Sequence, residues 1–174
     1  MNASSLNFRA LYLELVESTN MLRTLLAGIT PEEARFKPDP ESWSILETLC
    51  HLHDEERLDF RTRLDAMLNR PGQEWPPIDP QGWVTSKRYN EQDFHDLKER
   101  FFSERSQSLD WLKGLEGANW MASHTAGAVS LTAGDMLASW AAHDNLALRQ
   151  LVELRRARLE RISEPFHIEY AGEW

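Results

Sequence analysis

Several features that mark secreted and membrane proteins are missing from this sequence. It has one cysteine in 174 residues, so no disulfide can form within the chain, and the cytoplasm is the expected compartment. It has no run of 18 apolar residues, which argues against a membrane-spanning helix. Its first residues show no basic segment followed by an apolar one, so we do not predict a signal peptide.

Positive charge is also scarce. The chain has 19 lysines and arginines against 28 aspartates and glutamates, which gives a net charge of −9 at pH 7. An acidic surface repels nucleic-acid phosphates, and the most basic run, "ELRRARLERIS", carries acidic residues among its arginines. Nucleic-acid binding is therefore not expected. The hydrophobic content of 41% is instead ordinary for a globular domain.

Four segments have apolar residues at helical spacing, and they cover about 5–27, 43–69, 90–115 and 132–162. Start signals precede the last three, namely Ser44 with Glu47, Asn90 with Asp93, and Thr132 with Asp135. Pro165 stops the last helix. The segment 69–83 holds too many prolines for a regular element, and no alternating run predicts a sheet.

The helical pattern predicts an all-α fold. Four helices with one apolar face each must bury those faces against one another, which gives a four-helix bundle. We expect a single domain over 1–174, with a core of about 5–162 and a C-terminal tail of 163–174. The long connection between the second and third helices allows a topology other than simple up-down-up-down.

Histidines in two of these helices are the main candidates for chemistry. His143, in "WAAHDNLALRQL", shares the apolar face with Trp140 and Ala147. A core histidine satisfied by a hydrogen bond is the commoner interpretation of such a position. His51, in the second helix, has Asp54 and Glu55 three and four residues later.

The carboxylates of Asp54 and Glu55 can neighbour the His51 ring on the helix surface. A carboxylate in that place could orient a metal-binding histidine, and the alternative is an acidic face exposed to water. Cys50 lies about 100° from His51 around the helix, so it is expected to pack as a small hydrophobe.

Two longer motifs carry a family resemblance. "WSILETLCHLHDEE" and "LTAGDMLASWAAHDNLALRQLVELR" resemble the helix motifs of the DinB-like family of four-helix-bundle metalloproteins, and "SHTAGAVSLT" resembles the segment before the last helix. The similarity runs from about residue 8 to 156. It implies a bundle in which three histidines bind a divalent metal, often zinc or nickel. Family members with known activity include transferases and isomerases that use low-molecular-weight thiols.

Transferred to this sequence, the resemblance places two metal ligands on His51 and His143, while the third position is Ala147. A catalytic zinc commonly has three protein ligands, so two imidazoles should hold a metal weakly. The side chains that could replace the missing ligand or orient a ligand histidine are Asp54, Glu55, His124 and Gln150. The pocket wall is expected to include Trp43, Trp140 and Ala147.

Two functions follow. We expect a degenerate or weak site for a metal or a small ligand. The alternative is a divalent-metal-dependent enzyme of the thiol S-transferase, isomerase or hydrolase type, in which the metal lowers the pKa of a water or a thiol. Either function calls for a small molecule or a low-molecular-weight thiol as the partner, and a homodimer is compatible with both.

Overall fold

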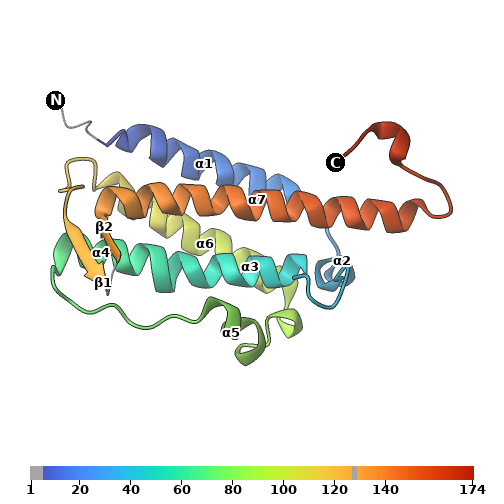
Figure 1. Ribbon diagram of the computed structural model, residues 1–174, viewed down its shortest axis with the longest axis horizontal. Coiled ribbons are helices and arrows are strands. Elements are labelled where there is room, and N and C mark those ends of the chain that lie inside the picture. The colour runs from blue at the N-terminus through green and yellow to red at the C-terminus, as the bar shows by residue number, and fades with distance from the viewer. Residues whose placement is uncertain (1–5, 127–128) are drawn as a thin grey trace.

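The computed structural model describes residues 6–126 and 129–174, and long helices dominate this part of the chain (Figure 1). The bundle consists of α1 (Phe8–Leu25), a continuous rod made of α3 (Ile45–Asp54), the π-helix η1 (Glu55–Phe60) and α4 (Arg61–Asn69), then α6 (Phe94–Lys113) and α7 (Ala133–Ser163). A short helix, α2 (Pro31–Arg35), joins α1 to α3. The predicted four-helix bundle is therefore confirmed.

Helix starts follow the predicted caps with one exception. Ser44 and Thr132 each form a complete capping box at the start of α3 and α7. The start of α6 is capped by Asp93 alone, which accepts a hydrogen bond from its own first turn. The predicted role of Asn90 there is wrong, because its side-chain oxygen instead accepts the hydroxyl of Ser44 at 2.7 Å.

The bundle has an up-down-down-up topology. In Figure 1, α1 and α7 run in one direction, whereas α3–α4 and α6 run in the other. Since α4 and α6 are parallel, the chain between them has to return along the whole bundle. This crossover, residues 70–93, contains α5 (Pro80–Ser86) and the 3₁₀ turn η2 (Tyr89–Glu91).

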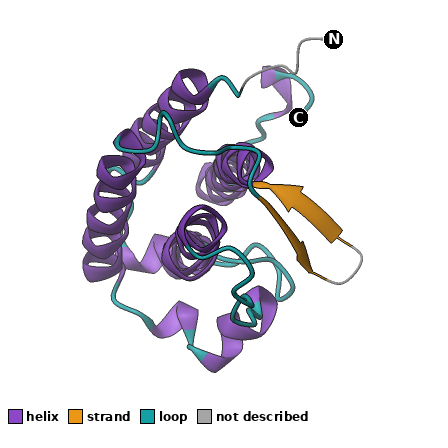
Figure 2. Ribbon diagram, turned by 90° about the vertical axis from the view of Figure 1, so that its left-hand side faces the viewer, coloured by secondary structure: helices purple, strands orange, loops and turns teal. Residues whose placement is uncertain are grey.

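Two short elements were not predicted. Helix α5 starts inside the proline-rich segment, where proline occupies the first helical position and Asp79 caps the turn. A two-stranded antiparallel hairpin, β1 (Ser123–Ala126) and β2 (Val129–Thr132), joins α6 to α7. Figure 2 shows this hairpin beside the bundle when the helices are viewed end-on. Strands of four residues are too short to give a readable alternation in the sequence.

The core has two apolar clusters, one toward each end of the bundle. One cluster contains Leu22, Leu49, Phe101 and Leu151, and the other contains Leu15, Leu64, Leu112 and Trp140. Each long helix contributes buried polar residues between the two clusters, namely Ser18 and Thr19, Glu56, Arg105 and Ser108, and Asp144. A buried polar layer thus crosses the middle of the bundle.

Arg105 is the centre of this polar layer. Its guanidinium donates to both carboxylate oxygens of Glu56 at 2.8 Å. It also donates to both oxygens of Asp144, at 2.6 and 2.8 Å. Ser18 donates to Asp144, and the indole of Trp140 donates to Glu56. The charges are therefore paired and hydrogen-bonded, which is the condition for keeping them away from water.

No helix among the described residues is long and apolar enough to cross a membrane.

Candidate functional site

The rings of His51 and His143 meet between α3 and α7, one turn from the polar layer. Their Nε2 atoms lie 3.1 Å apart although 92 residues separate them in the chain. The antiparallel course of α3 and α7 produces this meeting, because each helix places its histidine on the face that contacts the other. Both rings are only partly buried, so the pair is accessible.

Both imidazoles are held in the neutral form. Burial, helped by the neighbouring His143, lowers the pKa of His51 to about 4. Burial also lowers the pKa of His143 below its ordinary value. A neutral pair at 3.1 Å shares one hydrogen bond, with one Nε2–H donating to the other ring. The separation is also close to the roughly 3.3 Å between two nitrogen ligands of one tetrahedral zinc ion.

A cavity of about 500 Å³ lies in front of the two rings. The loop before α3, His51 of α3, the start of α5 and the middle of α7 line it, and it opens to solvent. Trp43 contacts the His51 ring edge-on at 5.0 Å between centroids. The other lining residues are Pro38, Glu41, Ser42, Gln81, Leu146, Ala147, Gln150, Glu153 and Leu154. Among the residues that the structure describes, no lysine or arginine lines the cavity. Its wall therefore combines apolar side chains with carboxylate, amide and imidazole groups and has no permanently positive one.

The residues present do not fit a three-histidine metal centre. Ala147 presents a methyl group to the cavity beside His143. In the part of the chain that the structure describes, no group of three histidine, cysteine, aspartate or glutamate side chains could hold a metal ion. Within the described residues, the Nδ1 atom of His51 is buried and has no hydrogen-bond partner. A histidine that binds a metal through Nε2 usually donates the proton on Nδ1 to a carboxylate or carbonyl that holds the ring in place.

The fold and these residues agree with the comparison with known families, in which the DinB superfamily model matches residues 14–151. The chain belongs to the DinB superfamily. Among solved structures, it is similar to YfiT from Bacillus subtilis, with a TM-score of 0.76, 16% identity and 89% of each chain covered. YfiT is described as a probable metal-dependent hydrolase with an unusual four-helix bundle topology. At this identity the likeness concerns the fold. A comparison with curated proteins gives no match.

The structure of this DinB-superfamily chain brings five of the predicted site residues together. His51, His143, Trp43, Ala147 and Gln150 all line the cavity. Gln150 is thus the one suggested substitute ligand that reaches it. Whether any of these side chains binds a metal stays a prediction.

Asp54 and Glu55 do not support the His51 ring, so that prediction is wrong. Asp54 points to the other side of α3, where its Oδ2 accepts hydrogen bonds from Lys87 at 2.7 Å and Tyr89 at 2.8 Å. Glu55 lies in the π-helix beside Asp59. Burial, followed by the charge of Asp59, raises the pKa of Glu55 to about 8.

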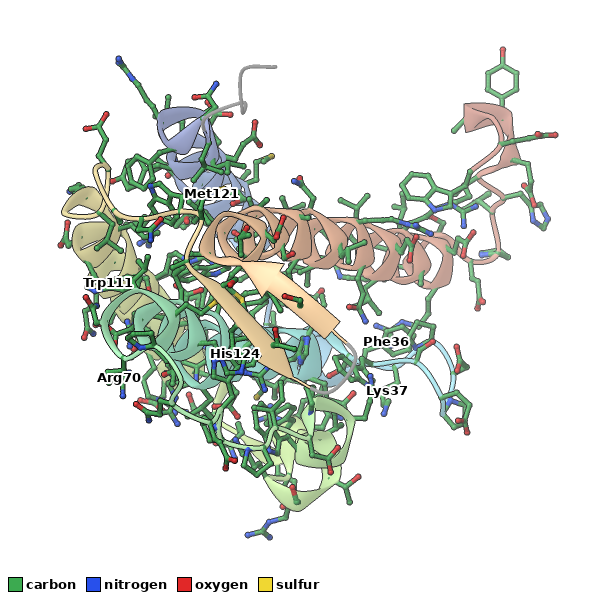
Figure 3. All side chains as sticks on the ribbon, turned by 60° about the vertical axis from the view of Figure 1, so that its left-hand side comes forward. Phe36, Lys37, Arg70, Trp111, Met121 and His124 are labelled. Atoms are coloured by element: carbon green, nitrogen blue, oxygen red, sulfur yellow. The ribbon has the colours of Figure 1, made fainter. Side chains whose placement is uncertain are left out.

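His124 and Trp140 also lie outside the cavity. His124 belongs to β1 of the hairpin (Figure 3), where its ring stacks on Trp75 of the crossover at 4.0 Å. Trp140 was expected in the pocket wall, but its ring stacks on Phe60 in the core. Its indole N–H is held by Glu56, which turns it toward the polar layer and away from the cavity.

Some cavity residues were not predicted from the sequence. Glu153 and Leu154 continue the His143–Ala147–Gln150 face of α7, so the helical period contained the signal that could have found them. Glu41 and Ser42 come from the loop before α3, and Gln81 comes from the short helix α5 of the crossover. No periodic pattern assigns a residue of a loop or of so short a helix to a cavity. Their position depends on how the crossover packs.

Proposed function

We propose that this chain binds a small polar molecule in the cavity over His51 and His143, and that the histidine pair holds a divalent metal only weakly. The observation that carries the proposal is the pair itself. Two neutral Nε2 atoms 3.1 Å apart face a cavity of about 500 Å³. Ala147, where the family has its third histidine, leaves space in that cavity and supplies no donor atom.

The cavity lining favours a neutral or cationic ligand. Glu41 brings negative charge to it, and Glu153 adds a carboxylate that also pairs with Arg149 at 2.9 Å. Gln81 and Gln150 bring amide donors and acceptors. Among the described lining residues, none is a lysine or arginine that could bind an anion. The indole of Trp43 offers an aromatic face, which attracts a cation with about 0.5–2 kcal/mol in other proteins.

The affinity of a metal ion at His51 and His143 would depend on the small molecule bound in the cavity. Zinc and nickel both accept imidazole nitrogen, and two histidines leave the remaining coordination positions to water or to the bound molecule. Affinity should then be lower than at a three-histidine centre, because one protein donor is missing.

Isothermal titration with zinc at pH 7.5 tests the metal half of this proposal. We expect weak one-to-one binding by the wild type and loss of this binding in His51→Ala and in His143→Ala. The matched control is His95→Ala, which removes an exposed histidine on α6 and should leave binding unchanged. Equal zinc binding by His51→Ala would overturn the assignment.

The ligand half needs a separate comparison. Phenethylamine and phenylacetate have the same ring and similar size but opposite charge, so thermal shifts with each report the charge preference of the cavity. We expect a shift with the amine that is reduced in Glu41→Gln/Glu153→Gln, and no shift with the acid. An equal or larger shift with phenylacetate would contradict the proposed ligand class.

A second candidate is a metal-dependent enzyme, either a hydrolase or a thiol transferase. The direct opening of the histidine pair onto the cavity favours it, as does the description of YfiT, which shares the fold. Hydrolysis of p-nitrophenyl acetate in the presence of zinc, compared between the wild type and His51→Ala, tests the hydrolase form. Zinc-dependent turnover that disappears with His51 would favour the enzyme over the binding protein.

A further inference from the structure

Two further cavities lie on the side of α3 and η1 that faces away from His51. One of about 200 Å³ is lined by Cys50, His53, Asp54, Arg57, Lys87, Tyr89, Gln92, Leu97 and Arg100. The other, of about 330 Å³, is lined by His53, Arg57, Arg100, Ser103 and Glu104. His53, Arg57 and Arg100 are common to both, so the two cavities adjoin. We call the surface around these three residues and Lys87 the basic cleft.

The basic cleft has the opposite charge character to the histidine cavity. Three cationic side chains line it, from η1 (Arg57), from the crossover (Lys87) and from α6 (Arg100). The two acidic residues in its walls are already bound. Both oxygens of Asp54 have partners, and Glu104 forms an ion pair with Arg61.

The two arginines retain donors for a ligand. The Nε of Arg57 is 3.6 Å from Asp54, and the Nε of Arg100 is 2.8 Å from the exposed Asp96. Within residues 6–126 and 129–174, no hydrogen bond engages the terminal nitrogens of either guanidinium. The guanidinium fork is suited to two parallel hydrogen bonds with a phosphate or carboxylate.

We propose that the basic cleft binds an oxyanion, namely the phosphate or carboxylate group of a small molecule. Arg57 and Arg100 hold the anion between them, while Lys87 pairs with Asp54 at 2.7 Å and so offsets the negative charge of that carboxylate in the wall. The contrast with the rest of the molecule supports this assignment, because a chain of net charge −9 repels anions elsewhere. The site is separate from the histidine cavity and does not depend on the function proposed for it.

An NMR titration with inorganic phosphate tests the proposal. Amide shifts of ¹⁵N-labelled wild type are followed against phosphate, with chloride at the same ionic strength as the reference. We expect saturable shifts confined to the residues around the cleft, and at least a five-fold weaker Kd for Arg57→Gln/Arg100→Gln. The control Arg9→Gln/Arg149→Gln changes the net charge equally at exposed positions and should keep the wild-type Kd.

The same titration contains the results that would overturn the site. An unchanged Kd in Arg57→Gln/Arg100→Gln contradicts it, as do shifts that never saturate or that spread over the whole surface. Acetate as a second probe separates the two oxyanions, since the tighter probe identifies the group. His51→Ala should bind phosphate as the wild type does, so failure at the histidine pair and failure at the basic cleft are distinguishable.

Discussion

Arg105 and Asp144 are joined by two hydrogen bonds, at 2.6 and 2.8 Å, between side chains that are at most 1% exposed. Asp144 directly follows His143, so this contact fixes the part of α7 that carries the histidine. The carboxylate therefore supports the site by anchoring the helix and has no contact with the cavity.

Removing Arg105 should destabilise the fold strongly. Arg105→Leu leaves Glu56 and Asp144 buried without their partner, which costs about 3–5 kcal/mol in comparable networks. Urea unfolding measures the change, with Arg149→Leu as the control because the Arg149 side chain is 77% exposed. A loss below about 1 kcal/mol for Arg105→Leu, the size typical of a surface pair, would contradict this interpretation of the polar layer.

Glu55 should make the fold less stable as the pH rises. Its pKa is raised to about 8 in the folded protein, against 4.5 as the ordinary value, by burial and then by Asp59. The folded state therefore holds the proton more tightly, and the stability that it gains is lost between about pH 4.5 and 8. The loss is a few kcal/mol at most, at about 1.4 kcal/mol per pKa unit.

Glu55→Gln isolates this effect because glutamine imitates the protonated acid. The stability difference between Glu55→Gln and the wild type, from urea unfolding at several pH values, should be small near pH 4.5 and favour the variant increasingly toward pH 8. The histidines, whose lowered pKa values act in the opposite direction, cancel in this difference. The control Glu99→Gln, at an exposed position on α6, should show no such trend. A difference that is flat with pH would mean that Glu55 is not held protonated.

The two rings should also affect each other's titration. His51 should become protonated near pH 4, because burial and then His143 disfavour its charged form. His143→Ala removes the second of these causes, so the pKa of His51 should rise toward its ordinary value. The ¹⁵N chemical shifts of the imidazole rings, followed against pH, measure the pKa of His51. The control His95→Ala should leave the titration curve of His51 unchanged. An ordinary pKa for His51 in the wild type would contradict the assigned causes, namely partial burial and the neighbouring His143.

The sequence predicted the four-helix bundle and the two histidines that face each other in it. The spacing of apolar residues predicted each long helix to within a few residues, and the motifs placed His51 and His143 on facing helices. The sequence did not predict the side chains that bind Asp54 and Trp140. An i, i+3 spacing allowed Asp54 to reach His51, but Lys87 and Tyr89 bind it from a crossover whose packing no local pattern encodes.

Glu55 was also misplaced, although its backbone keeps the regular helical spacing. Its N–H still bonds to the carbonyl of His51, one α-helical turn earlier. Its side chain is buried with those of Glu56 and Phe60 at η1, and its pKa responds to Asp59. An i, i+4 spacing shows that two side chains can be neighbours, but it does not show which way each of them turns.

The melting temperature of Ala147→His, with and without zinc, tests most directly whether position 147 is the gap in the site. In chelator the variant should melt below the wild type, because the new ring adds about 1–3 kcal/mol of overpacking. Added zinc should raise its melting temperature clearly and that of the wild type less, since a metal that binds only the folded state stabilises it. Ala147→Leu adds bulk without a donor atom, so zinc should raise its melting temperature no more than it raises that of the wild type. Equal zinc-induced shifts in Ala147→His and the wild type, or no shift in either, would contradict the account of an otherwise intact site that lacks one ligand.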